Sequence, residues 1–300
     1  MDIDMNDTTQ KPTVVAIGNF DGVHKGHAAL LKRARTIADA EGLELVALTF
    51  EPHPRTYFKP DGKPFRITPD AVKERRLKAA GAARVDVLDF NQIMADLSAA
   101  AFIEIMLVDL LNASHVVVGA DFHFGKGRTG HIDTLQADGR FTVDAVTLEE
   151  SDAAPVSSTR VREALEAGDI AAANELLGWE WEIEGEVAHG DKRGRELGYP
   201  TANVVLGDTI VPAHGIYAAL VDIGDGIWHR AAASIGIRPM FEVKTPMLEV
   251  FILDYQGDLY GKTIRIRPLK KLRDEQKFDD LEALKTQMAI DVAEVRLLIP

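Results

Sequence analysis

The chain has 300 residues, 46% of them hydrophobic, which is enough for two ordinary globular domains with buried cores. It carries 34 Lys and Arg against 47 Asp and Glu, and this net charge of −13 argues against a nucleic-acid binder, because such proteins usually present a basic face. The absence of cysteine excludes disulfides, zinc–thiolate sites and thiol nucleophiles.

The sequence gives no sign of targeting to a membrane or for export. Residues 1–9 have neither a basic start nor an apolar core, so we expect no signal peptide. The apolar segment 99–111 is interrupted by Glu104 and Asp109, so we expect no membrane-spanning helix. These features predict a cytoplasmic enzyme, a monomer or weak homo-oligomer, that binds neither membrane nor nucleic acid.

In the first half of the chain, short apolar runs alternate with helical patterns. The expected strands cover residues 13–18, 44–50, 84–90 and 115–119, and the expected helices cover 27–41, 69–80 and 98–111. Such alternation predicts an α/β domain with a Rossmann-like parallel sheet over residues 12–180. Ligands of these sheets bind at the carboxyl ends of the strands.

The loop after the first strand carries the clearest phosphate-binding pattern. It contains Gly18, Asn19, Phe20, Asp21 and Gly22, followed by His24 and His27 where a helix begins. Glycines let the backbone approach a phosphate, and the amides of a helix start favour an anion. His24 and His27 are expected on one face of the first turn, where they can donate to a phosphate that gains charge during transfer.

The second half changes to strands and turns after a short helical connector, residues 168–178. Expected strands cover 181–187, 215–222, 228–235, 247–253 and 262–268, and residues 281–298 have helical spacing. This order predicts an antiparallel β-barrel over residues 181–300 that ends in a helix. Before its middle strands lies a basic, glycine-containing loop with Gly194 and Arg195, which leads into Pro200-Thr201-Ala202-Asn203.

Several stretches of the first half resemble a known family. Residues 18–27 have the pattern G-x-F-D-G-x-H-x-G-H and resemble the H-x-G-H nucleotidyltransferases. Their exact residues are similar to those of the FAD synthetase branch of that family. Residues 49–54, 118–125 and 156–162 agree with it. The resemblance implies that His53 and Asp121 lie on the flavin side, and that Ser158, Thr159 and Arg162 bind the nucleotide phosphates.

The second half is similar to the riboflavin kinases through residues 200–203, 249–254 and 258–262. Together the two halves resemble the bacterial bifunctional riboflavin kinase/FMN adenylyltransferases, with ATP, riboflavin and FMN as substrates. The resemblance implies that Thr201 and Asn203 hold Mg²⁺, which prefers oxygen ligands. It also implies that Glu249 is the base that accepts the proton of the ribityl hydroxyl.

Some positions keep a simpler interpretation beside the functional one. His53 follows a strand and precedes Pro54, so it can equally belong to a rigid strand exit. Lys126 and Arg128 lie in a glycine-rich loop that either turns freely or covers a phosphate. Glu249 alone would be read as an outward strand residue. Met240 stands where the family commonly has threonine, which bears on the flavin side of the barrel.

Three other functions fit parts of the pattern. The chain can retain only one of the two activities, or it can be a non-catalytic flavin-binding module. A class I tRNA synthetase fragment also uses an H-x-G-H loop, but a lysine-rich second signature and a basic region are expected there. We therefore expect two consecutive reactions on one chain, in which riboflavin is phosphorylated to FMN and FMN is adenylylated to FAD.

Overall fold

The computed structural model describes residues 11–60, 62–147, 156–188, 198–240 and 243–300. The chain forms two compact units, each described by itself. Unit 1 comprises Met1–Gly62 and Lys73–Val156, and unit 2 comprises Lys63–Val72 and Ser157–Pro300. The predicted boundary near residue 180 stays a prediction for the functional domains, while the compact units divide after Val156.

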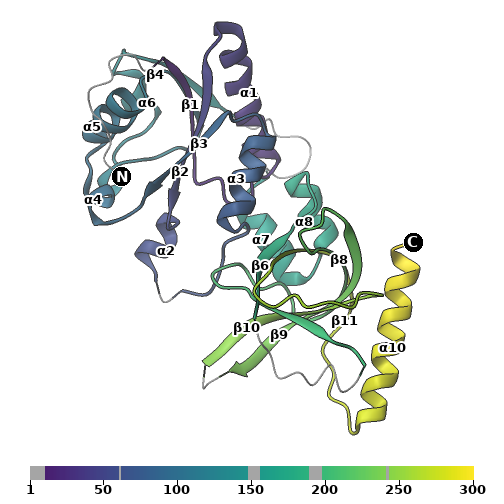
Figure 1. The fold of residues 1–300 in the computed structure, drawn as a ribbon. Coiled ribbons are helices and arrows are strands. Elements are labelled where there is room, and N and C mark those ends of the chain that lie inside the picture. Colours follow the sequence, from purple (N-terminus) through teal and green to yellow (C-terminus); the bar gives the residue numbers. More distant parts are fainter. Residues whose placement is uncertain (1–10, 61, 148–155, 189–197, 241–242) are drawn as a thin grey trace. The chain divides into compact units, whose positions relative to one another are not determined.

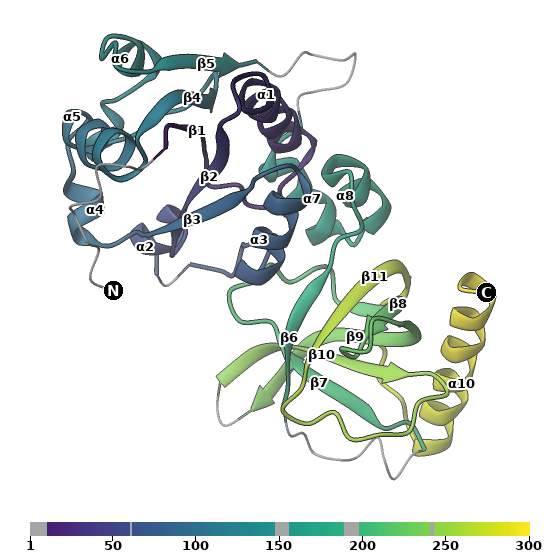
Figure 2. The same cartoon turned by 45° about the horizontal axis from the view of Figure 1, so that its top comes forward.

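Unit 1 is a five-stranded parallel sheet with the strand order β3-β2-β1-β4-β5 (Figures 1 and 2). The strands are β1 (Thr13–Ile17), β2 (Glu44–Glu51), β3 (Arg84–Asp89), β4 (Ala113–Gly119) and β5 (Thr142–Val146). The expected α/β class is thus confirmed, although the edge strand β5 was not predicted. The strand order reverses between β1 and β4, and the carboxyl ends at such a switch point form the binding crevice of these folds.

Helices cover both faces of this sheet because its strands are apolar on both sides. Val14 and Ala16 pack with α1 (Lys25–Glu41), whereas Val15 and Ile17 pack with α5 and η1 on the other face. The expected helix 98–111 is α5 (Ala99–Phe102) continued by a π-helix, η1 (Ile103–Leu110). The remaining helices of unit 1 are α2 (Pro54–Phe58), α3 (Asp70–Ala79, shared with unit 2), α4 (Gln92–Asp96), η2 (Lys126–Arg128) and α6 (Ile132–Gln136).

Unit 2 is a closed barrel with the strand order β10-β7-β6-β11-β8-β9, which confirms the predicted barrel. The strands are β6 (Ile183–Ala188), β7 (Thr201–Val205), β8 (Gly215–Asp222), β9 (Trp228–Met240), β10 (Val243–Ile252) and β11 (Thr263–Arg273). Alternate residues fill the interior; on β10 these are Leu248 and Val250, both fully buried. The side chains between them on each strand face outward.

Three helices complete unit 2. α7 (Ser158–Ala167) and α8 (Ile170–Leu177) join the barrel core through Val161, Leu165 and Leu177, together with Ile67 and Trp181. The indole of Trp181 donates to the carbonyl of Ile67 at 2.7 Å. α10 (Leu281–Leu298) lies on the outer surface of the barrel. α7 and α8 therefore fold with the barrel, because their apolar faces are buried there.

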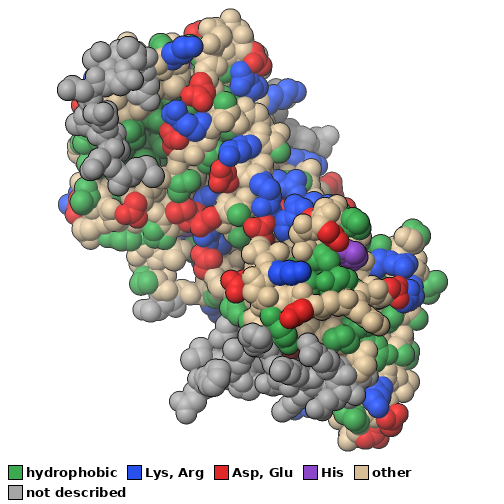
Figure 3. Space-filling view, in the orientation of Figure 1, with side chains coloured by type: hydrophobic (Ala, Val, Ile, Leu, Met, Phe, Trp, Pro, Cys, Tyr) green, Lys and Arg blue, Asp and Glu red, His purple; other side chains and the backbone are tan. Residues whose placement is uncertain are grey.

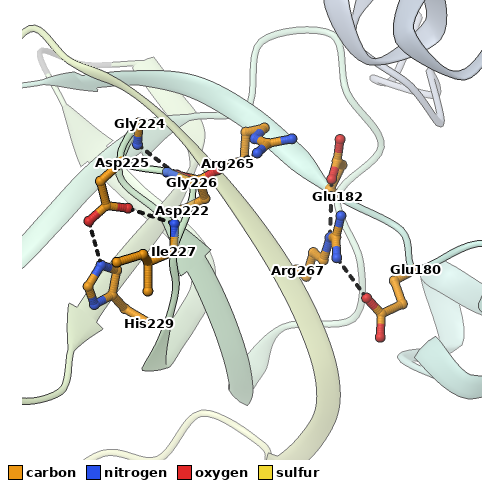
Figure 4. Close-up of polar contacts among 10 residues, drawn as sticks. All are labelled: Glu180, Glu182, Asp222, Gly224, Asp225, Gly226, Ile227, His229, Arg265 and Arg267. Atoms are coloured by element: carbon orange, nitrogen blue, oxygen red, sulfur yellow. Dashed lines mark hydrogen bonds and ion pairs between the residues drawn. The ribbon is translucent and has the colours of Figure 1, made fainter.

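The turn between β8 and β9 is closed by acidic side chains (Figure 4). Asp222 accepts from the amides of Gly224 at 2.8 Å and Gly226 at 3.2 Å, and it pairs with Arg265. Burial opposes its ionisation, but these hydrogen bonds outweigh the burial and hold the pKa of Asp222 below its ordinary value. Next to it, Arg267 bonds Glu180 at 2.8 Å and Glu182 at 3.2 Å.

The surface mixes charges of both signs. The face drawn in Figure 3 carries Lys and Arg side chains beside Asp and Glu side chains. No helix in the described part of the chain combines the length and apolar character needed to cross a membrane.

Candidate active sites

The loop after β1 has a backbone that few side chains tolerate. Phe20, Gly22 and Val23 have φ values of 50°, 88° and 38°, in the left-handed region. Phe20 holds this conformation because its ring is fully buried in the core between the sheet and α1. Gly18 lies so close that a Cβ would meet that ring at 3.1 Å. A strained, well-anchored loop at a strand end is typical of a ligand-binding site.

His24 and His27 form a compact pair at the start of α1. His24 is the N-cap rather than a first-turn residue, and its Nδ1 accepts from the amide of His27 at 3.4 Å. The two rings stack with centroids 3.7 Å apart, and the edge of Phe20 packs against His27 at 5.3 Å. Stacking therefore fixes both imidazoles on the same side of the helix start, and their contact with a phosphate stays a prediction.

The charge state of His27 is set by its surroundings. Burial, and in second place the neighbouring His24, hold the pKa of His27 well below its ordinary value. A neutral imidazole carries one N–H and can donate one hydrogen bond. Its Nδ1 is buried and has no hydrogen-bond partner among the described residues. His27 is therefore a neutral imidazole packed between the rings of Phe20 and His24.

The other predicted residues of this site lie at neighbouring strand ends. Asp121 follows β4, the strand next to β1 on the far side of the switch point, and it is exposed. His53 follows β2 and caps α2, since its Nδ1 accepts from the amide of Arg55 at 3.0 Å. Glu51, at the end of β2, forms an ion pair with the buried Lys73. The strand-exit reading of His53 is thus supported, and its flavin contact stays a prediction.

The glycine-rich loop with Lys126 and Arg128 is docked on the start of α5. The amide of Lys126 donates to the carbonyl of Leu97 at 2.7 Å, and its ammonium pairs with Asp96 at 2.8 Å. A Cβ on Gly125 would lie 2.7 Å from the amide nitrogen of Ala99. The turn is therefore held by backbone contacts, and a phosphate role for Lys126 or Arg128 stays a prediction.

Ser158, Thr159 and Arg162 lie in the first turns of α7, which belongs to unit 2. Ser157 caps this helix by accepting from the amide of Arg160. The guanidinium of Arg162 donates to the carbonyl of Phe65 at 2.8 Å. The nucleotide contacts of these three residues stay a prediction.

The predicted kinase residues gather on one outer face of the barrel. In the pairing of β7 with β10, Asn203 lies opposite Glu249, and Thr201 lies opposite Phe251. The intervening residues Ala202 and Val250 point into the core. Thr201, Asn203 and Glu249 are all half-buried. The register therefore places two neutral oxygen donors and one carboxylate on adjacent positions of the same surface.

The sequence reasoning missed two features of this surface. Residues 201–205 were read as part of a loop but form the strand β7, paired with both β10 and β6. Ser234 of β9 lies opposite Glu249 on the side away from Asn203. The alternation around Ser234, between the buried Ala233 and Ile235, was the signal that could have identified it.

Some predicted positions lie outside the described residues. Gly194 and Arg195 belong to the range 189–197, for which no structure is described. The side chain of Met240 also lies outside the described residues.

Comparison with known proteins adds to this geometry. The FAD synthetase family matches residues 6–160, and the riboflavin kinase family matches residues 177–299. A bifunctional riboflavin kinase/FMN adenylyltransferase of Pseudomonas fluorescens is 45% identical over 95% of this chain and 92% of its own length. The chain belongs to the bifunctional riboflavin kinase/FMN adenylyltransferase family. This is an enzyme family of flavin cofactor biosynthesis, as the sequence predicted.

Further members of the riboflavin kinase/FMN adenylyltransferase family agree. The Bacillus subtilis and Escherichia coli relatives of the same name are 37% and 38% identical over 95% and 96% of this chain. They are covered over 92% and 93% of their lengths. A solved structure titled as a macrolide-efflux protein from Streptococcus pneumoniae has a TM-score of 0.84 at 34% identity and covers 97% of this chain and 96% of its own. Its fold extends over both units, although its title names another activity.

Proposed function

We propose that unit 2 phosphorylates riboflavin with ATP to give FMN, and that unit 1 then joins FMN to AMP from a second ATP and releases pyrophosphate. The observation that carries the proposal is the direct opposition of Glu249 and Asn203 on β10 and β7. It sets a carboxylate beside amide and hydroxyl oxygens, the combination that a metal-dependent phosphoryl transfer to an alcohol needs.

In the kinase step, Glu249 accepts the proton from the ribityl 5′-hydroxyl while that oxygen attacks the γ-phosphate of ATP. Thr201 and Asn203 are the proposed protein ligands of Mg²⁺, which neutralises charge on the phosphates when it is bound. Within the described ranges, no group of three or more His, Asp and Glu side chains could hold a metal. Thr201 and Asn203 offer neutral oxygen ligands, which leave room for phosphate oxygens around the ion.

In the adenylyl step, the phosphate of FMN is the nucleophile and needs no base, because it is already ionised. His24 and His27 orient the α-phosphate of ATP and donate to it at the start of α1. The low pKa of His27 keeps its imidazole neutral before the nucleotide binds, and the ring offers a directed hydrogen bond to the phosphate. The amides of residues 18–22 and of the first turn of α1 supply the remaining positive field.

One assay tests the proposal. Purified protein is incubated with riboflavin, ATP and Mg²⁺, and flavins are separated at successive times. FMN is expected first and FAD second, with pyrophosphate released in step with FAD. Formation of FMN alone or of FAD only from added FMN would mean that one activity is absent, and no turnover at all would favour a flavin-binding module. The expected cytoplasmic location, weak or absent self-association and lack of nucleic-acid binding also stay predictions.

A further inference from the structure

A row of outward-facing residues crosses four strands of the barrel. It runs from Ala218 on β8 through Ala232 on β9 and Phe251 on β10 to Thr201 on β7, each opposite the next in register. At one end of this row lies α10, whose Val295 is fully buried against Ala218. At the other end lies the proposed metal ligand Thr201. The terminal helix and the candidate kinase site therefore share one surface.

The two alanines explain how close α10 comes to the sheet. Ala218 and Ala232 have short side chains, so Val292 and Val295 of the helix reach the strands directly. The helix is held there by ion pairs at two points: Arg296 bonds both oxygens of Asp254 at 2.7 and 2.9 Å, and Arg273 bonds those of Asp291 at 2.7 and 2.9 Å. These contacts hold α10 against the face of the barrel that also carries the candidate site.

Phe251 lies between α10 and the segment that leads into the proposed metal ligands of β7. Its ring packs in the α10 cluster, and it also meets the ring of Tyr199 edge-on at a centroid distance of 5.1 Å. Tyr199 precedes Pro200 and Thr201, where the chain enters β7. Phe251 lies two residues after Glu249 on the same face of β10. The aromatic pair therefore joins the entry of β7 to the strand that carries the proposed base.

We propose that Phe251 and Tyr199 are positioning residues of the kinase site: their edge-on pair holds Thr201 and Asn203 beside Glu249 before any metal binds. The inference rests on the proposed kinase function of unit 2. If the pair is lost, the metal has to order the start of β7 itself. Because edge-on aromatic pairs are worth about 0.5–1.5 kcal/mol, the Mg²⁺ concentration for half-maximal kinase rate is expected to rise about 2- to 10-fold.

The test compares four variants of the full chain. Phe251→Leu and Tyr199→Leu remove one ring each, Tyr199→Phe keeps the ring, and Val292→Ala shortens an apolar side chain of the same α10 cluster but leaves both rings in place. The Mg²⁺ dependence of FMN formation is measured with saturating ATP and riboflavin. In parallel, hydrogen exchange of the peptide spanning residues 199–205 is followed without metal or substrate.

Both leucine variants are expected to raise the half-saturating Mg²⁺ about 2- to 10-fold, with smaller changes in the rate at saturating Mg²⁺, and to speed exchange in residues 199–205. Their combination should do little more than either alone, because one pair is lost in each case. Tyr199→Phe should restore both values. Val292→Ala should lower the melting temperature but leave both values near those of the unsubstituted chain.

Two results would overturn the inference. If the leucine variants keep normal Mg²⁺ dependence and normal exchange, Phe251 only packs α10. If Val292→Ala shifts both values equally, the effect is a general loosening of the helix and not a property of the aromatic pair. Failure of the proposed function is distinct, because in that case the unsubstituted chain itself would form no FMN.

Discussion

Glu249 of β10 lies directly opposite Asn203 of β7, with Ser234 of β9 on its other side. In an antiparallel pair, residues that oppose each other this way have Cβ atoms about 4.5–5.5 Å apart, close enough for their side chains to share a ligand. The register therefore supports the prediction that Glu249 acts in the chemistry, which the variants below test.

Replacing Glu249 by Gln keeps the size of the side chain but removes the proton acceptor. Since general bases contribute about 10²–10⁴-fold, riboflavin phosphorylation is expected to fall by that order. Added FMN should still be converted to FAD at close to the normal rate, because that step belongs to unit 1. Intact phosphorylation would show that Glu249 is only a strand residue. If both reactions disappear, circular dichroism distinguishes misfolding from coupled sites.

A combined Thr201→Val and Asn203→Ala variant removes both proposed metal ligands of β7. We expect a raised Mg²⁺ requirement for the remaining kinase activity and unchanged FAD formation from added FMN, measured by titrating Mg²⁺ in each assay. Thr263→Val, on the exposed start of β11, is the matched control for loss of a strand hydroxyl. An unchanged Mg²⁺ requirement in the double variant would assign the metal to other residues.

His27→Ala removes a donor at the start of α1. We expect FMN to accumulate while FAD formation drops about 10²–10³-fold, the usual loss when one transition-state donor is removed. Flavins separated after incubation with riboflavin and ATP provide the measurement. Lys32→Ala, an exposed position on the same helix, is the control. FAD formation near normal in His27→Ala would contradict the assignment of this loop.

The low pKa of His27 also predicts how stability depends on pH. Below its ordinary pKa of about 6.5 the unfolded chain binds a proton that the folded chain resists, so the free energy of unfolding falls as pH drops through this range. His27→Asn should flatten that slope in denaturant unfolding between about pH 5 and 7. Asp222 acts in the same direction but only near and below the ordinary pKa of a carboxyl, about 3.9. An equal slope in both proteins would mean that His27 protonates normally in the fold.

Two glycines with similar φ values differ in the space available for an added Cβ. Gly125 and Gly139 have φ values of 72° and 75°, but only Gly125 has a neighbour that an added Cβ would strike, the amide of Ala99 at 2.7 Å. Gly139→Ala is expected to cost about 1–2 kcal/mol, the usual penalty of this conformation. Gly125→Ala should cost about 1–3 kcal/mol more in urea unfolding, because its ψ of 170° belongs to a region that essentially only glycine adopts and because the backbone has to move away from Ala99. Equal losses would show that the loop yields freely.

Much of unit 1 could be predicted because its signals are local. The β-branched run before Gly18 and the glycine that ends α1 at Gly42 mark their own boundaries. The position of His24 as N-cap could not be predicted in the same way, since histidine is an uncommon cap and its choice depends on the stacked ring of His27.

The predictions that failed concern one strand and one helix. Residues 201–205 were not predicted as a strand, but they pair with β10 and β6 as β7, and this pairing overrides the low strand propensity of Asn203. The mixed helix at α5 and η1 was expected as one α-helix, since a π-helical hydrogen-bond pattern leaves no mark in hydrophobic spacing. The packing of α7 with the barrel depends on Ile67, about ninety residues earlier in the chain.

The contribution of Lys63–Val72 to unit 2 affects where the barrel can be separated from the rest of the chain. The riboflavin kinase match begins at residue 177, but the folding unit around the barrel also includes Lys63–Val72 and α7. A fragment starting at residue 177 leaves the buried indole of Trp181 without the carbonyl of Ile67, at a cost of about 1–3 kcal/mol, and uncovers apolar surface that α7 had covered. A free-standing barrel of this sequence would need substitutions at that surface.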